Sequence, residues 1–129
     1  MEIIKVLVVD DEEEICELTR SFLRRKNYCT LGANSADEAI EVVKKEKPHL
    51  VLLDVRLGDA SGMDVLQKIK EIDKDIKVVM VTALSDEESA RQAESRGAEA
   101  YIVKPFTASY LDEIILKKIA GLGLKTNNR

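Results

Sequence analysis

A short apolar run that ends in a carboxylate constrains this sequence more than any other feature. Residues 50–53 are leucine, valine, leucine and leucine, and Asp54 follows directly. A run of this length and composition is typical of a β-strand buried on both faces, as in a parallel sheet covered by helices. Asp54 would then lie at the carboxyl end of the strand, which is the edge where open α/β sheets bind ligands.

The whole chain alternates between apolar runs and helical patterns. The other apolar runs cover residues 3–9, 28–33, 76–81 and 100–103. Apolar residues recur at helical spacing over residues 12–26, 35–47, 63–72 and 107–120. A further helix is predicted over residues 86–96, which are mostly polar with several alanines, so we expect it to be loosely packed. Ser35, Ser85 and Thr107 are the predicted caps of the second, fourth and last helices. This alternation predicts a parallel sheet with right-handed crossovers, in which all strands end at one edge.

The residues at the ends of the other strands bring more polar groups to this edge. Asp10 and Asp11 follow the first strand, Thr82 follows the fourth and Lys104 follows the fifth. Each alone has a simpler interpretation, as a helix cap, a strand-end hydroxyl or a surface charge. Together, clustered carboxylates without histidine or cysteine favour Mg²⁺, and a lysine with a hydroxyl can bind phosphoryl oxygens. The set predicts transfer of a phosphoryl group to a carboxylate.

Composition excludes several other classes. The chain has 129 residues, enough for one domain with a substantial core. Its formal net charge of -4 argues against a nucleic-acid surface. No apolar run is long enough to span a membrane and no signal peptide opens the sequence, so no membrane partner is expected. Cys16 and Cys29 lack metal-ligand spacing, so we expect buried, reduced thiols in a cytoplasmic protein rather than a disulfide.

In their order and spacing, these residues resemble the receiver domain of two-component response regulators. The matching residues, between residue 2 and about residue 121, are Asp10-Asp11, Asp54 with Gly62, Thr82-Ala83, Tyr101 and Lys104-Pro105-Phe106. The resemblance implies a flavodoxin-like (βα)5 fold, a doubly wound five-stranded parallel sheet with strand order 2-1-3-4-5. It also implies a receiver domain over residues 1–121. Residues 122–129 would be a frayed tail or the start of a linker, in a stand-alone regulator or in a longer protein.

The resemblance assigns a phosphoacceptor and a metal site. Asp54 is the expected phosphoacceptor. Asp10, Asp11 and Asp54, with the backbone carbonyl of Arg56, are the expected ligands of Mg²⁺, and Asp10 can act through a water molecule.

The resemblance assigns further roles to the ends of the fourth and fifth strands. Lys104 and Thr82 are expected to bind the incoming phosphoryl oxygens. Thr82 and Tyr101 are the expected switch residues, although Tyr101 is equally well read as an ordinary edge-strand aromatic. The peptide bond between Lys104 and Pro105 is expected to be cis.

The same resemblance implies partners for the domain. A sensor histidine kinase or a histidine phosphotransfer protein is expected to supply the phosphoryl group. The domain would catalyse only its own phosphorylation and dephosphorylation, so it is not expected to be an enzyme. An output domain or target would contact the face of residues 85–96, 100–103 and 107–120, in a monomer or a phosphorylation-dependent dimer. The alternative is a non-phosphorylated docking module, which predicts a lost acceptor or lysine.

The chain departs from the family pattern at three positions. Gly58 stands where many members have proline, so we expect the loop of residues 56–61 to be freer to move. Arg56 and Leu84 fall at positions that vary in the family. A cation lying across the phosphoryl oxygens and an apolar side chain over the path of the attacking water are both expected to slow loss of phosphate.

Two other classes of α/β protein fit less well. A haloacid-dehalogenase-type phosphatase needs an Asp-x-Asp pattern after the first strand and a cap domain. A flavodoxin-like electron carrier needs a Ser/Thr/Gly-rich loop after that strand, where this chain has two aspartates and three glutamates at residues 10–14.

Overall fold

A parallel β-sheet forms the centre of the protein. The computed structural model describes residues 3–83 and 86–121, and the side chains of residues 3–83 and 86–117. In these residues the central sheet contains β1 (Lys5–Val9), β2 (Cys29–Ala33), β3 (Leu50–Leu53), β6 (Lys77–Thr82) and β7 (Ala100–Val103). Their order is β2-β1-β3-β6-β7, and every neighbouring pair is parallel. The predicted flavodoxin-like order is therefore confirmed.

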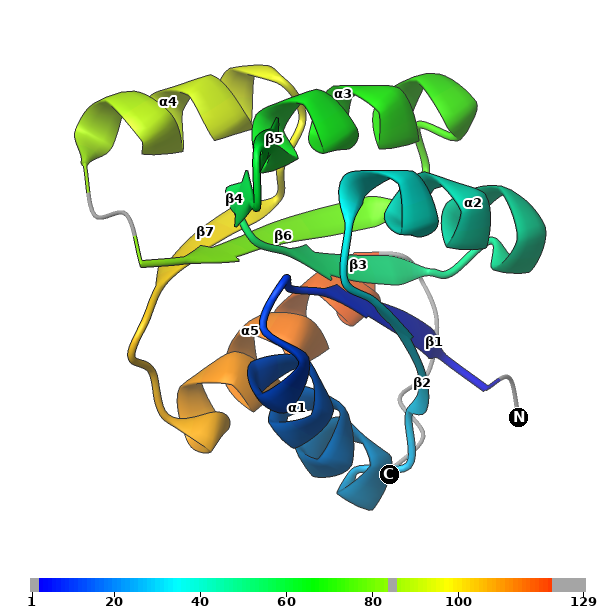
Figure 1. The fold of residues 1–129 in the computed structure, drawn as a ribbon. Helices are drawn as coiled ribbons and strands as arrows, with labels where there is room; N and C mark the ends of the chain where they lie inside the picture. The colour runs from blue at the N-terminus through cyan, green and yellow to red at the C-terminus, as the bar shows by residue number, and fades with distance from the viewer. Residues whose placement is uncertain (1–2, 84–85, 122–129) are drawn as a thin grey trace.

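Helices cover both faces of the sheet (Figure 1). On one face lie α2 (Ala36–Glu46), α3 (Gly62–Ile72) and α4 (Glu87–Ser95). On the other face lie α1 (Glu13–Arg25) and α5 (Ala108–Gly121). None of the helices in the described ranges combines the length and hydropathy that a membrane span requires.

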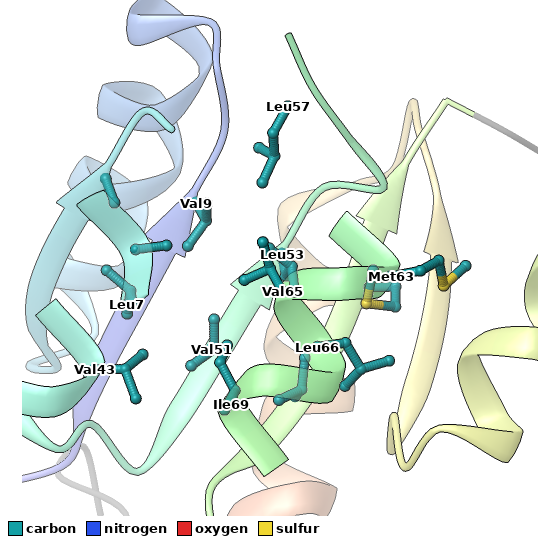
Figure 2. Packing of buried hydrophobic residues seen from close by; sticks show 14 of the residues in the cluster. Leu7, Val9, Val43, Val51, Leu53, Leu57, Met63, Val65, Leu66 and Ile69 are labelled. Carbon is teal, nitrogen blue, oxygen red and sulfur yellow. The ribbon is translucent and has the colours of Figure 1, made fainter. Parts of the chain in front are cut away.

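The alternation of side chains along each strand divides the core into two clusters. Figure 2 shows the cluster beneath α2 and α3, where Leu7 and Val9 of β1 lie beside Val51 and Leu53 of β3. The cluster on the α1 and α5 side contains the intervening residues Val6, Val8, Leu50 and Leu52. Both faces of β3 are thus buried, which explains why its sequence is continuously apolar up to Asp54. Cys16 is buried in the cluster on the α1 and α5 side, but Cys29 is exposed, so the expectation of two buried thiols was wrong for Cys29.

Two of the three predicted helix caps are present. The Ser35 hydroxyl accepts a hydrogen bond from the Glu38 N–H at 3.2 Å, before the first residue of α2. The Thr107 hydroxyl accepts one from the Tyr110 N–H at 3.0 Å, before α5. Each satisfies an N–H group that the helix itself leaves without an acceptor.

The predicted cap of α4 was wrong. Asp86, not the preceding serine, caps this helix, and its carboxylate accepts a hydrogen bond from the Ser89 N–H at 2.7 Å. A carboxylate fills the same role as a hydroxyl and also interacts favourably with the positive end of the helix dipole. The predicted cap, Ser85, lies outside the described residues.

A short hairpin forms within the loop that follows β3. The strands β4 (Arg56–Leu57) and β5 (Ala60–Ser61) pair in antiparallel register, Arg56 with Ser61 and Leu57 with Ala60. Gly58 begins the turn between them with φ +60°, a left-handed conformation that suits glycine. Strands of two residues are too short to leave a period in the sequence, so this pairing was not predicted, and the expected freedom of the segment to move stays a prediction.

Candidate functional site

The polar residues predicted from the strand ends converge at one edge of the sheet. Asp10 follows β1, Asp54 follows β3, Thr82 ends β6 and Lys104 follows β7. Asp10, Asp54 and Thr82 are 4%, 9% and 1% exposed, so two carboxylates are held largely out of water. Buried carboxylates require partners, because removing an unpaired charge from water is costly.

Lys104 is the partner of both buried carboxylates. Its Nζ atom lies 2.8 Å from Asp10 Oδ2 and 3.0 Å from Asp54 Oδ2. Burial alone lowers the pKa of Lys104, but its hydrogen bonds to Asp10 and Asp54 and their charges outweigh burial and raise the pKa above the ordinary 10.5. Lys104 is therefore positively charged at neutral pH.

Asp10 also belongs to a cluster of three carboxylates. Asp10, Asp11 and Glu12 each offer an oxygen, and these atoms lie within 4.8 Å of one another. These oxygens, without nitrogen or sulfur donors, fit Mg²⁺ by their chemistry. Sequence reasoning placed Glu12 only at the start of the first predicted helix, and the consecutive run Asp10-Asp11-Glu12 was the signal that could have added it to the site. Asp54 is connected to this cluster by Lys104, which contacts both Asp10 and Asp54.

Main-chain N–H groups fix the three aspartates. Glu12 N donates to Asp10 Oδ1 at 2.9 Å, and Arg56 N donates to Asp54 Oδ1 at 3.1 Å. The third donor comes from the hairpin, where Gly58 N donates to Asp11 Oδ2 at 3.0 Å. Charge-assisted bonds of this kind are stronger than neutral ones, so the carboxylates are aimed before any ligand arrives.

Two hollows open at this edge. The first, of about 300 Å³, contains the polar site and is lined by Asp11, Glu12, Asp54, Arg56, Thr82, Ala83 and Lys104. The second, of about 370 Å³, is largely apolar and shares Lys104 with the first. Its apolar lining includes Ile15 and Leu18 of α1 and Phe106 after β7.

The other predicted residues lie around this site. The peptide bond between Lys104 and Pro105 is cis. The Arg56 side chain is exposed in the hairpin. Leu84 lies outside the described residues, so the lifetime-tuning role assigned to Arg56 and Leu84 stays a prediction.

Tyr101 of β7 connects the edge of the sheet to α4. Its side chain is partly buried against the core cluster that contains Met80. Burial raises the pKa of the Tyr101 hydroxyl above the ordinary 10.0; the charge of Asp86 adds to this, and a hydrogen bond with Ser89 opposes it. The hydroxyl therefore lies by the first turn of α4, a neighbour that strand pattern alone could not reveal.

Comparison with known proteins agrees with this geometry. The family described as the response regulator receiver domain matches residues 6–116. Sporulation initiation phosphotransferase F of Bacillus subtilis is 32% identical over 123 residues, which are 95% of this chain and 97% of that protein. The transcriptional regulatory protein ResD of Bacillus subtilis is 37% identical over 113 residues, 88% of this chain but 45% of ResD. The chain thus spans less than half of that relative.

A solved structure extends the similarity to three dimensions. The CheY-like response regulator receiver domain protein from Methanospirillum hungatei JF-1 matches with a TM-score of 0.91 and 30% sequence identity. The match covers 95% of this chain and 98% of that one. The chain belongs to the receiver domain family of two-component response regulators, a family of signalling domains in which phosphorylation and Mg²⁺ dependence are typical.

Proposed function

We propose that this receiver domain accepts a phosphoryl group on Asp54 in a Mg²⁺-dependent reaction. The observation that carries the proposal is the position of Asp54, a buried carboxylate whose Oδ2 lies 3.0 Å from Lys104 Nζ at the end of β3. An Asp54 oxygen forms the new bond to phosphorus while the bond to the donor's leaving atom breaks, which gives an acyl phosphate. Where the donor is a phosphohistidine, the imidazole nitrogen keeps the electron pair and takes a proton.

The surrounding residues are proposed to bind the metal ion and the phosphoryl oxygens. Asp10 and Asp11, with Asp54 and the carbonyl of Arg56, are proposed to hold Mg²⁺, which when bound neutralises charge on the phosphoryl oxygens. Lys104 is proposed to bind one phosphoryl oxygen. The Thr82 hydroxyl is proposed to bind another. The domain would accelerate only its own phosphorylation and dephosphorylation.

A labelling experiment tests this proposal directly. The purified chain, incubated with Mg²⁺ and acetyl phosphate, is expected to gain the mass of one phosphoryl group, and a chelator is expected to prevent the gain. No mass change in Mg²⁺ over a range of donor concentrations would contradict the proposal. The alternative of a non-phosphorylated docking module gains no support, because Asp54 and Lys104 are both present and in contact.

The apolar hollow beside the site is proposed to receive the phosphodonor protein. A histidine on that partner must reach Asp54, so its surface must cover the rim, where Lys104 lines both hollows. Leu18 of α1 lines the apolar hollow and is 67% exposed. Exposed apolar side chains beside a charged site are typical of a protein contact. The proposed donor is a histidine kinase or a histidine phosphotransfer protein.

Leu18→Glu should separate the two kinds of donor. Transfer from a phosphorylated histidine phosphotransfer protein that serves the wild type is expected to slow about tenfold, because the change places a charge in an apolar contact. Phosphorylation by acetyl phosphate should be unchanged. Ile3→Glu is the matched control, since Ile3 is also apolar and 56% exposed but does not line the hollow. Equal slowing with both donors would place Leu18 in the chemistry rather than in docking.

The signalling response is proposed to run from Thr82 through Tyr101 to α4. Only Ala93 of α4 is buried among the described residues of that helix, so few apolar contacts hold it. Beryllofluoride with Mg²⁺ should therefore shift NMR amide signals mainly in residues 86–96 and 100–103. Asp54→Asn, which removes the anchor for beryllofluoride, is the control. Shifts confined to α2 would contradict the proposed route.

A further inference from the structure

The hairpin after β3 holds two carboxylates of the site with two main-chain N–H groups. Arg56 N donates to Asp54 Oδ1, within a turn of adjacent residues. Gly58 N donates to Asp11 Oδ2 at 3.0 Å, across 47 positions of sequence. The first bond is local and follows from the turn. The second joins the segments that follow β1 and β3, so it forms only when these two strands are paired.

Glycine at position 58 makes the second bond possible in two ways. Its φ of +60° is one that side chains with a β-carbon rarely adopt, so glycine allows the turn that points its N–H toward Asp11. Proline, which stands here in many receiver domains, has no N–H to donate and fixes φ near −65°. The departure of this chain from that pattern therefore adds a hydrogen-bond donor at the site.

Asp11 needs a hydrogen-bond donor to fix its orientation more than Asp10 does. Asp10 is buried and bonded to Lys104, whereas Asp11 is exposed. An exposed carboxylate samples several side-chain rotamers and loses that freedom when it binds an ion. The bond from Gly58 uses Oδ2, which leaves the Oδ1 lone pairs of Asp11 for a cation.

We propose that the main-chain N–H of Gly58 positions Asp11 as a metal ligand. This role rests on the proposed function, because it concerns the proposed Mg²⁺ site. Carboxylates that bind metals are commonly held by hydrogen bonds from outside the ligand set, and these bonds set their orientation. Gly58 acts through Asp11 and does not itself touch the cation. Metal occupancy and the conformation of the β4–β5 hairpin are coupled through this bond.

Removing one N–H tests the positioning role. Glycolic acid in place of Gly58 replaces the N–H with an ester oxygen and leaves φ unrestricted. The dissociation constant for Mg²⁺, measured by NMR titration of the amides of residues 9–12, is expected to rise about tenfold. The matched control replaces only the main-chain N–H of Asp59 with an ester oxygen and keeps its side chain. In the described part of the chain this N–H has no acceptor. The control is expected to bind Mg²⁺ as the wild type does.

A second variant separates the N–H from the absence of a side chain. Gly58→Asn keeps the N–H, and asparagine tolerates the left-handed region better than most residues. The space around Gly58 is open, with no atom within 4 Å of an added β-carbon. This variant is expected to bind Mg²⁺ within about twofold of the wild type, since the donor that positions the ligand remains.

The outcomes distinguish this role from the proposed function. If the wild type binds Mg²⁺ and the Gly58 ester binds equally well or better, the positioning role is overturned while the proposed metal site stands. If the wild type itself binds no Mg²⁺, the proposed function fails first and the positioning role fails with it. Weaker binding in the Gly58 ester alone, with Asp59 ester and Gly58→Asn unchanged, supports both.

Discussion

Asp54→Asn is expected to take up no phosphoryl group under conditions that label the wild type completely. The substitution keeps the size of the side chain but removes the anionic oxygen that is proposed to attack phosphorus. The carboxylate accepts from two donors, Lys104 Nζ at Oδ2 and Arg56 N at Oδ1. An amide offers only one acceptor to these two donors, so its NH₂ group faces a donor whichever way it is turned. We expect the variant to be less stable by about 1–3 kcal/mol.

The measurement is the intact mass after incubation with acetyl phosphate and Mg²⁺, with circular dichroism to establish that the variant is folded. Asp59→Asn is the matched control, because Asp59 is an exposed carboxylate in the hairpin after β3. This control should label as the wild type does. Full labelling of Asp54→Asn, together with loss of labelling in a variant of Asp10 or Asp11, would move the acceptor to another carboxylate.

Gly62→Ala should destabilise the fold by about 2–4 kcal/mol, because the new methyl group has no room. Gly62 is buried at the start of α3, and its N–H donates to the Val55 carbonyl at 2.5 Å. An added β-carbon would lie 2.9 Å from Val55 Cα and well inside contact distance of the Asp54 carbonyl oxygen. Both neighbours are backbone, so the segment that carries Asp54 must shift. The loss of stability should be accompanied by slower phosphorylation.

Urea unfolding measures this effect, and Gly32→Ala in β2 of the central sheet provides a control. A β-carbon at Gly32 meets only the flexible end of the Arg20 side chain, at 2.9 Å, which can move away. The free energy of unfolding of this control should change by no more than about 1 kcal/mol. A Gly62→Ala protein as stable as the control would show that the backbone around Asp54 relaxes easily.

The sheet and the convergence of the site were predictable because each rests on a local pattern. Continuous apolar runs such as residues 50–53 identify strands buried on both faces. Parallel strands end at one edge, so Asp10, Asp54, Thr82 and Lys104 had to meet there. The resemblance to the receiver family predicts the same residues for the site.

The features that sequence reasoning missed depend on contacts between distant segments. The bond from Gly58 to Asp11 joins residues 47 positions apart, and no periodicity records it. Glu12 joins the carboxylate cluster through the conformation of the chain after β1. The apolar hollow needs α1 and the segment after β7 side by side, which only the completed fold provides.

The two contacts of Lys104 determine when its ammonium group loses water. The ammonium group already lies between Asp10 and Asp54, at 2.8 and 3.0 Å, and its side chain is 22% exposed. Most of its water is therefore given up when the protein folds, and the two carboxylates compensate for that loss. In the proposed reaction, a phosphoryl oxygen arriving at Asp54 would meet a cation that is already largely dehydrated and would need only to change partners. Little solvent has to be reorganised at the moment of reaction.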